Sequence, residues 1–174
     1  MTTLRPFTLD DLLLFNPVNL DPLTETYALS FYLTYLSRWP NYFVTAESPK
    51  GKVQGYCMGK CEGEGTLWHG HVTAVTVGPE YRRQGLAGVL MEGLECTTES
   101  VRGYFVDLFV RASNEVAIGM YERMGYSKYR KVLGYYSGRE EEDAWDMRKA
   151  MGRDVMGESV VPLGRDIRPE ELEW

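Results

Sequence analysis

Residues 79–88 read "PEYRRQGLAG", and this stretch, with the strand before it and the helix after it, decides the fold. Two arginines and a glutamine lead into a glycine-rich turn, which is followed by apolar residues at helical spacing: Leu86, Val89, Leu90 and Leu94. A loop that aims backbone N–H groups at one point, just before a helix begins, commonly binds phosphate. The spacing is neither that of a P-loop nor G-x-G-x-x-G. We therefore expect a phosphorylated ligand here, with a simple structural turn as the alternative.

A buried strand is predicted on each side of this loop and its helix. Residues 69–77, "HGHVTAVTV", are rich in β-branched side chains and nearly continuous in hydrophobicity, which is typical of a central strand. Residues 104–110, "YFVDLFV", follow the helix as a second such strand. Asn114 then opens another helix, and Gly125 suits the position just beyond a helix end.

The remaining segments complete an alternating pattern. Strands are predicted over 3–7, 42–48, 53–60, 126–136 and 144–150, with a first helix ending near Phe15 and a second that starts at Thr24 or Thr26 and ends before Trp39. The order indicates an α/β (α+β) fold, a mixed seven-stranded sheet with helices on both faces. Residues 1–150 form the predicted domain. Residues 151–174, rich in Gly, Pro and charge, are an extension that is docked on a partner or flexible.

Composition narrows the class of protein. A chain of 174 residues suits a single domain, and a net charge of −6 argues against nucleic acid as the main partner. The three cysteines and two histidines lack the spacing of a metal site, so no metal is expected. Unpaired thiols and the lack of a long apolar run favour a cytoplasmic protein that does not enter the membrane.

Two motifs resemble those of a known family. Residues 82–87, "RRQGLA", match the R/Q-x-x-G-x-G/A signature of the GNAT acetyltransferases, and residues 114–126, "NEVAIGMYERMGY", are similar to that family's N-x-x-A-x-x-x-Y-x-x-x-G-[FY] segment. Over about residues 1–150 the chain resembles the catalytic subunits of NatB-type N-terminal acetyltransferases, through segments such as "NLDPLTETY" (19–27) and "WHGHVTAV" (68–75).

The resemblance implies a reaction and its partners. Enzymes of this type transfer the acetyl group of acetyl-CoA to the α-amine of proteins that begin Met-Asp, Met-Glu, Met-Asn or Met-Gln, by direct attack of the amine on the thioester. They work on nascent polypeptide N-termini at the ribosome with a large helical-repeat auxiliary subunit. The alternatives are a GNAT enzyme that acetylates lysine or a small amine, and a non-catalytic acyl-CoA-binding subunit.

The resemblance also assigns a cofactor site. The strand at 72–77 lies beside the pantetheine arm, Val75 offers an N–H to the thioester carbonyl, and the loop holds the pyrophosphate. The implied cofactor-binding residues are Val75, Val77, Arg82, Arg83, Gln84, Gly85, Leu86, Ala87, Gly88 and Asn114.

The chemistry needs a base and an acid. An α-amine has a pKa of about 7.7–8.0, so a weak base is sufficient, and His71 is the candidate, acting directly or through one water. His69 lies on the same face of the strand, two residues earlier, and packing is the alternative for either histidine. The family places Tyr121 near the coenzyme sulfur as general acid, whereas the apolar stripe around it also allows a core tyrosine.

The peptide site is implied on two segments. The early helix–helix loop offers Glu25 and Tyr27, and the late hairpin offers Tyr135 and Tyr136, with ordinary packing as the alternative. Thr73 and Ala74 on the central strand are further candidates. The helix predicted over 26–37 is apolar on nearly every side, which indicates either burial or a docking face for another chain.

Overall fold

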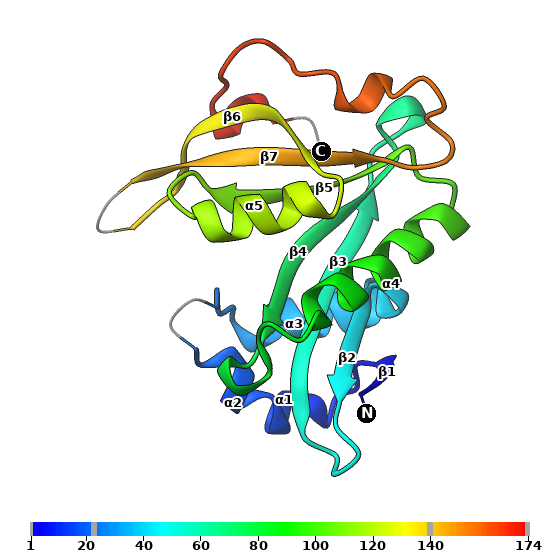
Figure 1. The fold of residues 1–174 in the computed structure, drawn as a ribbon, viewed down its shortest axis with the longest axis vertical. Helices are drawn as coiled ribbons and strands as arrows, with labels where there is room; N and C mark the ends of the chain where they lie inside the picture. Colours follow the sequence, from blue (N-terminus) through cyan, green and yellow to red (C-terminus); the bar gives the residue numbers. More distant parts are fainter. Residues whose placement is uncertain (1, 22–23, 139–140, 173–174) are drawn as a thin grey trace. The chain divides into compact units, whose positions relative to one another are not determined.

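The computed structural model describes residues 2–21, 24–138 and 141–172. Its seven strands follow the order β1-β2-β3-β4-β5-β7-β6 (Figure 1), so the predicted seven-stranded mixed sheet is confirmed. The chain divides into two compact units, Met1–Lys60 with Val72–Thr97, and Cys61–His71 with Thr98–Trp174.

The first unit holds the amino-terminal strands and helices. Its elements are β1 (Thr3–Pro6), α1 (Asp11–Leu14), α2 (Asn16–Asn19), α3 (Leu29–Arg38), β2 (Phe43–Glu47), most of β3 (Val53–Glu62), most of β4 (His69–Val77) and most of α4 (Leu86–Ser100). β1 pairs with β2, and β2 with β3, both antiparallel. The central strand is predicted to the residue, whereas α2 lies between the two predicted helices, where the sequence predicts no further helix.

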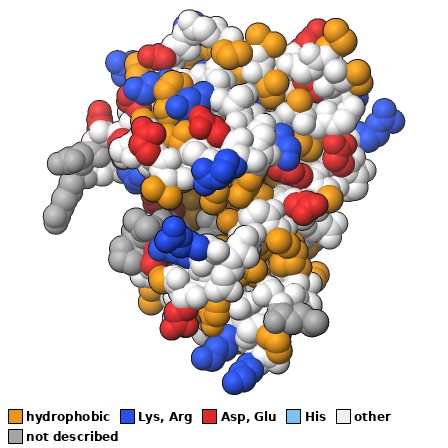
Figure 2. All heavy atoms as spheres, in the orientation of Figure 1, with side chains coloured by type: hydrophobic (Ala, Val, Ile, Leu, Met, Phe, Trp, Pro, Cys, Tyr) orange, Lys and Arg blue, Asp and Glu red, His pale blue; other side chains and the backbone are white. Residues whose placement is uncertain are grey.

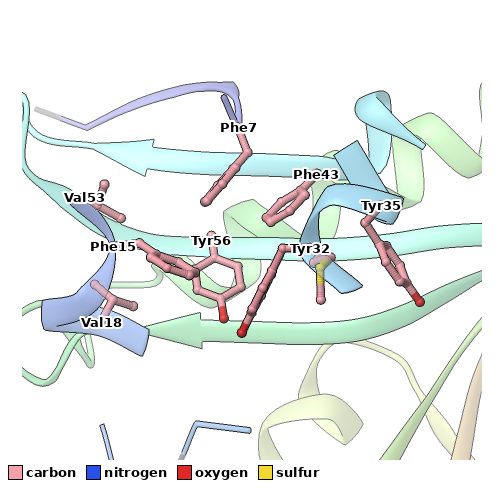
Figure 3. Packing of buried hydrophobic residues seen from close by; sticks show 9 residues of the cluster. Phe7, Phe15, Val18, Tyr32, Tyr35, Phe43, Val53 and Tyr56 are labelled. Carbon is pink, nitrogen blue, oxygen red and sulfur yellow. The ribbon is translucent and has the colours of Figure 1, made fainter. Parts of the chain in front are cut away.

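Aromatic side chains fill the core of this unit (Figure 3). Phe7 stacks on Phe43 with the ring centroids 4.0 Å apart. The hydroxyls of Tyr32 and Tyr56 both donate to Oδ1 of Asn19, at 3.3 and 2.6 Å. Since a buried phenol needs a partner for its hydroxyl, this shared acceptor lets two tyrosines enter an otherwise apolar core and ties α2 to α3 and β3.

The helix α3 begins later than the sequence predicts, at Leu29 instead of Thr24 or Thr26. The hydroxyl of Thr24 is hydrogen-bonded to that of Thr76 on β4, 2.5 Å away. Ala28, the residue before the helix, is extended (φ −63°, ψ 149°). Thr24 therefore bonds its segment to β4 instead of capping a helix. Helix propensity alone does not predict this contact.

The second unit holds the carboxy-terminal half of the sheet. Its elements are β5 (Phe105–Arg111), α5 (Glu115–Arg123), β6 (Ser127–Tyr136), β7 (Glu142–Ala150) and the ends of β3, β4 and α4. β7 pairs antiparallel with β5 and with β6. As predicted, Asn114 caps α5, accepting from the N–H of Ala117 at 3.1 Å, and Gly125 follows the helix with a φ of +92°. The segment between the strands predicted over 126–136 and 144–150 includes residues 139–140, which lie outside the described residues.

The carboxy-terminal segment packs on this unit. Ile167 forms a parallel bridge with Val132 of β6 and is 1% exposed. Its carbonyl accepts from the N–H of Leu133 at 2.8 Å, and its own N–H donates to the carbonyl of Lys131 at 3.0 Å. Ile167 and Leu172 join Val132 and Ala144 in one buried cluster. The segment thus covers the open edge of β6, and docking on another chain stays a prediction.

Short 3₁₀ turns complete the chain, at Pro40–Tyr42, Gly65–Leu67, Pro79–Tyr81, Glu158–Val160 and Pro169–Glu171. Among the helices of the described ranges, none has the length and hydrophobicity to cross a bilayer. Within the same ranges, no group of three or more His, Cys, Asp or Glu could hold a metal ion. Cys57, Cys61 and Cys96 form no disulfide bond.

Candidate active site

The glycine-rich loop of the first unit has the geometry of an anion site. Arg83 and Gly85 both have positive φ, +61° and +82°, and both are exposed. A side chain at Gly85 would meet no atom within 4 Å, so the backbone conformation, not space, requires glycine here. The N–H of Val89 donates to the carbonyl of Gly85 at 3.2 Å, which starts α4 directly after the loop.

The start of α4 supplies the donors. In any α-helix the N–H groups of the first turn have no acceptor within the helix and carry partial positive charge. Here those residues are Leu86, Ala87 and Gly88. With the exposed loop beside them, they fit a phosphorylated ligand such as the pyrophosphate of a coenzyme.

The two arginines of the loop have different surroundings. Nη2 of Arg82 lies 2.7 Å from Oδ1 of Asp21, and its Nε donates to the carbonyl of Val77 at 3.1 Å. Arg82 therefore braces the loop against the end of β4 and the α2 region. The side chains of Arg83 and Gln84 are exposed, and Gln84 donates to the carbonyl of Glu80 at 3.3 Å. Sequence alone does not predict this division.

Two tyrosines of the first unit are hydrogen-bonded to Thr73 on β4. The hydroxyls of Tyr35 and Thr73 lie 2.7 Å apart, and the hydroxyl of Tyr27 donates to the carbonyl of Thr73 at 3.4 Å. Tyr27 also stacks on Phe31 at 4.4 Å. Three of the predicted peptide residues of this unit, Tyr27, Thr73 and Ala74, thus adjoin the aromatic core, since Ala74 packs on it.

The other predicted residues of this unit lie nearer to solvent. Glu25 is exposed on the segment that precedes α3. Val75 and Val77 are half-buried on β4. β4 therefore carries predicted peptide residues and predicted cofactor residues in direct succession.

His71 lies in the second unit, at the start of β4. Nδ1 of His71 is 2.8 Å from Oδ1 of Asp107 on β5, and both residues are buried. Burial alone would raise the pKa of Asp107. The adjacent His71, by its charge and hydrogen bond, together with His69 and Arg148, lowers that pKa to about 2. The carboxyl group is therefore ionised at neutral pH and accepts a hydrogen bond from Nδ1 of the imidazole.

Aromatic side chains of β5 and β6 lie next to His71. The His71 ring lies 5.7 Å from that of Phe109, and Phe109 stacks on Tyr135 at 4.6 Å. Tyr136 meets Tyr135 edge-on at 5.0 Å and donates its hydroxyl to the carbonyl of Phe109 at 3.2 Å. The Arg111 guanidinium lies 4.1 Å from the centre of the Tyr136 ring. The structure thus brings His71, Tyr135 and Tyr136 together.

Helix α5 places the two remaining predicted residues at opposite ends. Asn114 caps the helix, as described above, so its side-chain oxygen is used within the chain. Tyr121 lies near the other end, 8% exposed, with its ring 5.9 Å from that of Tyr126. Contact of either residue with a coenzyme stays a prediction.

Sequence reasoning missed three residues of these clusters: Tyr35, Asp107 and Phe109. Asp107 had a signal, because a lone carboxylate inside the apolar strand "YFVDLFV" must have a charged or hydrogen-bonding partner. Tyr35 and Phe109 had none, because an aromatic residue in an apolar helix or strand looks like core from its sequence position.

Comparisons with known proteins agree with these features. The acetyltransferase (GNAT) family model matches residues 8–126, more than half of the chain. The N-terminal acetyltransferase B complex catalytic subunit NAA20 of Arabidopsis thaliana is 62% identical over 175 residues, 100% of this chain and 99% of that protein. N-alpha-acetyltransferase 20 of Dictyostelium discoideum is 58% identical over 174 residues, covering 99% of each chain.

Solved structures extend the similarity to three dimensions. Naa20 of Chaetomium thermophilum, crystallised with a bisubstrate analogue, superposes with a TM-score of 0.89 at 44% identity, covering 97% of both chains. A chain of the NatB acetyltransferase complex bound to a bisubstrate inhibitor gives a TM-score of 0.87 at 42% identity, covering 99% of both chains. The chain therefore belongs to the GNAT acetyltransferases and, within them, to the family of NatB catalytic subunits.

Proposed function

We propose that this chain is the catalytic subunit of a NatB-type N-terminal acetyltransferase, which transfers acetyl from acetyl-CoA to the α-amine of proteins that begin Met-Asp, Met-Glu, Met-Asn or Met-Gln. The observation that carries this proposal is the near full-length similarity to NAA20, at 62% identity. The glycine-rich loop with its positive φ values supports an intact cofactor site, which a purely structural subunit would not need.

The cofactor site is assigned to the loop and to α4. The N–H groups of residues 84–88 and the side chain of Arg83 hold the pyrophosphate, while Arg82 keeps the loop on β4 through Asp21. In the first unit Val75 and Val77 line the pantetheine arm, and in the second unit Asn114, which caps α5, is the assigned coenzyme contact. When bound, acetyl-CoA supplies an acetyl group already activated as a thioester.

The reaction moves one acetyl group and releases one proton. His71 takes a proton from the ammonium form of the α-amine, and the neutral nitrogen then attacks the thioester carbonyl, forming the C–N bond as the C–S bond breaks. Tyr121 donates its phenolic proton to the departing thiolate and recovers one from the amide nitrogen. The main-chain N–H of Val75 stabilises the carbonyl oxygen.

The peptide is assigned to the aromatic surfaces described above. In the first unit, Tyr27, Thr73 and Ala74 contribute, with Glu25 near the amine. In the second unit, Tyr135 and Tyr136 contribute. Phenol rings offer apolar faces to the methionine side chain, and their hydroxyls offer donors to the carboxylate or amide of the second residue.

The assembly and location follow the same family. The chain works with a large helical-repeat auxiliary subunit, at the ribosome, on nascent polypeptides in the cytoplasm. Exposed leucines on α1 and α3 support a partner surface, because Leu13 is 80% and Leu29 60% exposed. The absence of a disulfide bond among Cys57, Cys61 and Cys96 suits a reducing compartment.

A peptide panel tests the proposal. Full-length chain, with and without a candidate auxiliary subunit, is supplied with acetyl-CoA and peptides beginning Met-Asp, Met-Leu or Ser. We expect acetylation of Met-Asp at a kcat/KM far above that of the other two. Equal rates on all three, or a preference for a lysine side chain in an amino-terminally blocked peptide, would overturn the assignment. Binding of acetyl-CoA without any transfer would indicate a non-catalytic subunit.

A further inference from the structure

The two histidines of this chain share a single carboxylate. Oδ1 of Asp107 lies 2.8 Å from Nδ1 of His71 and 3.6 Å from Nε2 of His69. All three residues belong to the second unit, and all are buried. The two GNAT motifs, residues 82–87 and 114–126, include neither Asp107 nor His69, and only the structure shows that these two residues lie together with His71.

The hydrogen-bond partners determine which ring nitrogen carries a hydrogen. Because the Asp107 carboxylate only accepts, Nδ1 of His71 is the donor, and the lone pair of the neutral ring is on Nε2. Nδ1 of His69 lies 2.5 Å from the carbonyl of Leu67, which also only accepts. His69 therefore also carries its hydrogen on Nδ1, but its Nε2 points to acidic groups.

The two imidazole rings differ in the groups that lie near their Nε2 atoms. Nε2 of His69 has Glu62 at 4.0 Å as well as Asp107 at 3.6 Å, so this nitrogen lies between two carboxylates. The ring stacks on Phe105 at 4.5 Å, nearly parallel. Both ring nitrogens of His69 are thus surrounded by groups of this chain, whereas the Nε2 lone pair of His71 is left for a substrate proton.

Charged groups on three other strands belong to the same network. Beyond the histidines of β4, Glu62 lies on β3, Arg130 on β6, and Asp146 and Arg148 on β7. Asp146 is paired with Arg130 at 2.8 Å and with Arg148 at 3.3 Å. A cavity of about 440 Å³ opens on Asp107 and His69, and Glu62, Phe105 and Arg148 also line it.

From these contacts we infer that Asp107 is a positioning residue for the acetyl transfer: it orients His71 and keeps the hydrogen of that ring on Nδ1, so that Nε2 is the base. His69 and Arg148 keep Asp107 ionised. This inference rests on the proposed function, and it decides between the two histidines. The role is that of a carboxylate that orients an imidazole base without taking its proton.

The proton inventory balances without a co-reactant. Nε2 of His71 accepts the proton of the substrate ammonium group, which makes the ring an imidazolium. The Nδ1 hydrogen stays between His71 and Asp107, so the new positive charge lies beside a carboxylate that already bears one negative charge. The imidazolium then returns the Nε2 proton to solvent, and the ring regains its starting tautomer.

The first test needs no substrate. With only two histidines in the chain, ¹⁵N-histidine NMR of the full-length protein resolves the protonation of each ring. We expect His71 to show a protonated Nδ1 and an unprotonated Nε2 at neutral pH. An Nε2–H tautomer of His71 would overturn the inference. Because this spectrum is independent of activity, it separates failure of this inference from failure of the proposed function.

The second test uses Asp107→Asn, with Asp11→Asn as the matched control. Both changes neutralise a buried carboxylate, but Asp11 pairs with Arg5 at 2.7 Å in the other unit. Asp107→Asn is expected to lower kcat about 10²-fold, leave the KM for acetyl-CoA unchanged, and move the acidic limb of the pH–rate profile to lower pH. The last shift follows because the imidazolium loses its stabilising carboxylate.

The control separates a chemical role from a structural one. Asp11→Asn is expected to lower stability but to leave both kcat and the pH–rate profile as in the parent chain. An Asp107→Asn chain with parental kcat and profile would contradict the inference, as would identical kinetic losses in both variants. If Asp107→Asn does not fold, the tautomer measurement on the parent chain decides alone.

Discussion

Tyr121 can be a core residue or the general acid, and only the second role needs its hydroxyl group. As a core residue it needs only its ring, which packs near Tyr126, whereas as the acid it needs its hydroxyl. Tyr121→Phe removes that hydroxyl and keeps the ring. We expect kcat to fall roughly 10²-fold while acetyl-CoA affinity, measured by calorimetry, is unchanged. Tyr126→Phe, on a tyrosine that is 3% exposed, is the control and should keep its kcat. Unchanged turnover in Tyr121→Phe would assign that tyrosine to the core.

Gly85 allows backbone strain and ligand contact to be measured separately. Gly85 and Gly51 have similar φ values, +82° and +74°, and a side chain at either would meet no atom within 4 Å. Alanine at each position should therefore lower the free energy of unfolding by a similar amount, about 1 kcal/mol. Only Gly85→Ala is expected to raise the KM for acetyl-CoA, because only that residue lies in the proposed phosphate loop. Equal KM values for acetyl-CoA in both variants would show that the loop is not part of the cofactor site.

At the scale of elements, α1 and α3 present leucines to solvent. Leu13 and Leu14 on α1 are 80% and 56% exposed, and Leu29 and Leu33 on α3 are 60% and 40% exposed. Single exposed leucines are ordinary, but several on neighbouring short helices of one unit favour a protein partner. This finding answers the question raised by the apolar helix: Tyr32 and Tyr35 are buried in the core, while the other side of the helix is open.

The partner surface can be tested by adding charge to it. We expect the double variant Leu13→Glu, Leu29→Glu to bind the auxiliary subunit at least tenfold more weakly, a loss of about 1.4 kcal/mol, because two carboxylates would be buried without partners. Its melting temperature should barely change, since both side chains are exposed. Val116→Glu, at a position 85% exposed on α5, is the control. Equal binding by all three chains, measured by interferometry, would place the partner elsewhere.

The junction of β1 and α1 makes stability depend on pH. Burial would raise the pKa of Asp11, but hydrogen bonds from Arg5 and Thr8 outweigh it and lower that pKa. A carboxyl whose pKa is depressed in the folded state adds stability above its unfolded pKa of about 3.9 and loses it as pH falls through the lower folded value. Asp11→Asn should therefore reduce the free energy of unfolding at pH 7. It should also make that free energy decrease less steeply as the pH falls below about 4. Parallel stability–pH curves for parent and variant would contradict this.

The elements show what sequence patterns can predict. β4 and α4 are predicted to the residue or nearly so, because hydrophobic periodicity and a glycine-rich loop bound them. The start of α3 is missed because the hydroxyl of Thr24 bonds across the unit to Thr76, and no local pattern records that contact. The motifs likewise predict roles for the loop and Tyr121, but not for Asp107, because its contact with His71 depends on which strand lies beside β4.

At the scale of the whole molecule, charge is dispersed. Figure 2 shows acidic and basic side chains interspersed with apolar ones over the face in view, and the net charge is −6. Such a surface gives no reason to expect binding to a polyanion. It agrees with a small, locally placed phosphate site of the kind proposed for residues 82–88.

The carboxy-terminal segment contributes to the stability of its unit. Ile167 is 1% exposed and lies in a cluster with Val132, Ala144 and Leu172. Ile167→Ala is expected to lower the free energy of unfolding by about 2–5 kcal/mol, measured by urea denaturation. Val161→Ala, at a position 61% exposed, is the control and should cost less than about 0.5 kcal/mol. Equal stabilities would mean that the segment is not docked in solution. The sequence predicted only an aperiodic tail, because docking by one isoleucine leaves no repeat.

The pairing of Ile167 with β6 has a consequence for how the protein is made. Ile167 follows all seven strands along the chain, so during synthesis every strand of the sheet leaves the exit tunnel while the edge of β6 still lacks this hydrogen-bonding neighbour. A bare strand edge is a template for pairing with other chains. A newly synthesised copy therefore passes through an interval, which ends when the segment around Ile167 has emerged and docked, in which chaperone protection matters most.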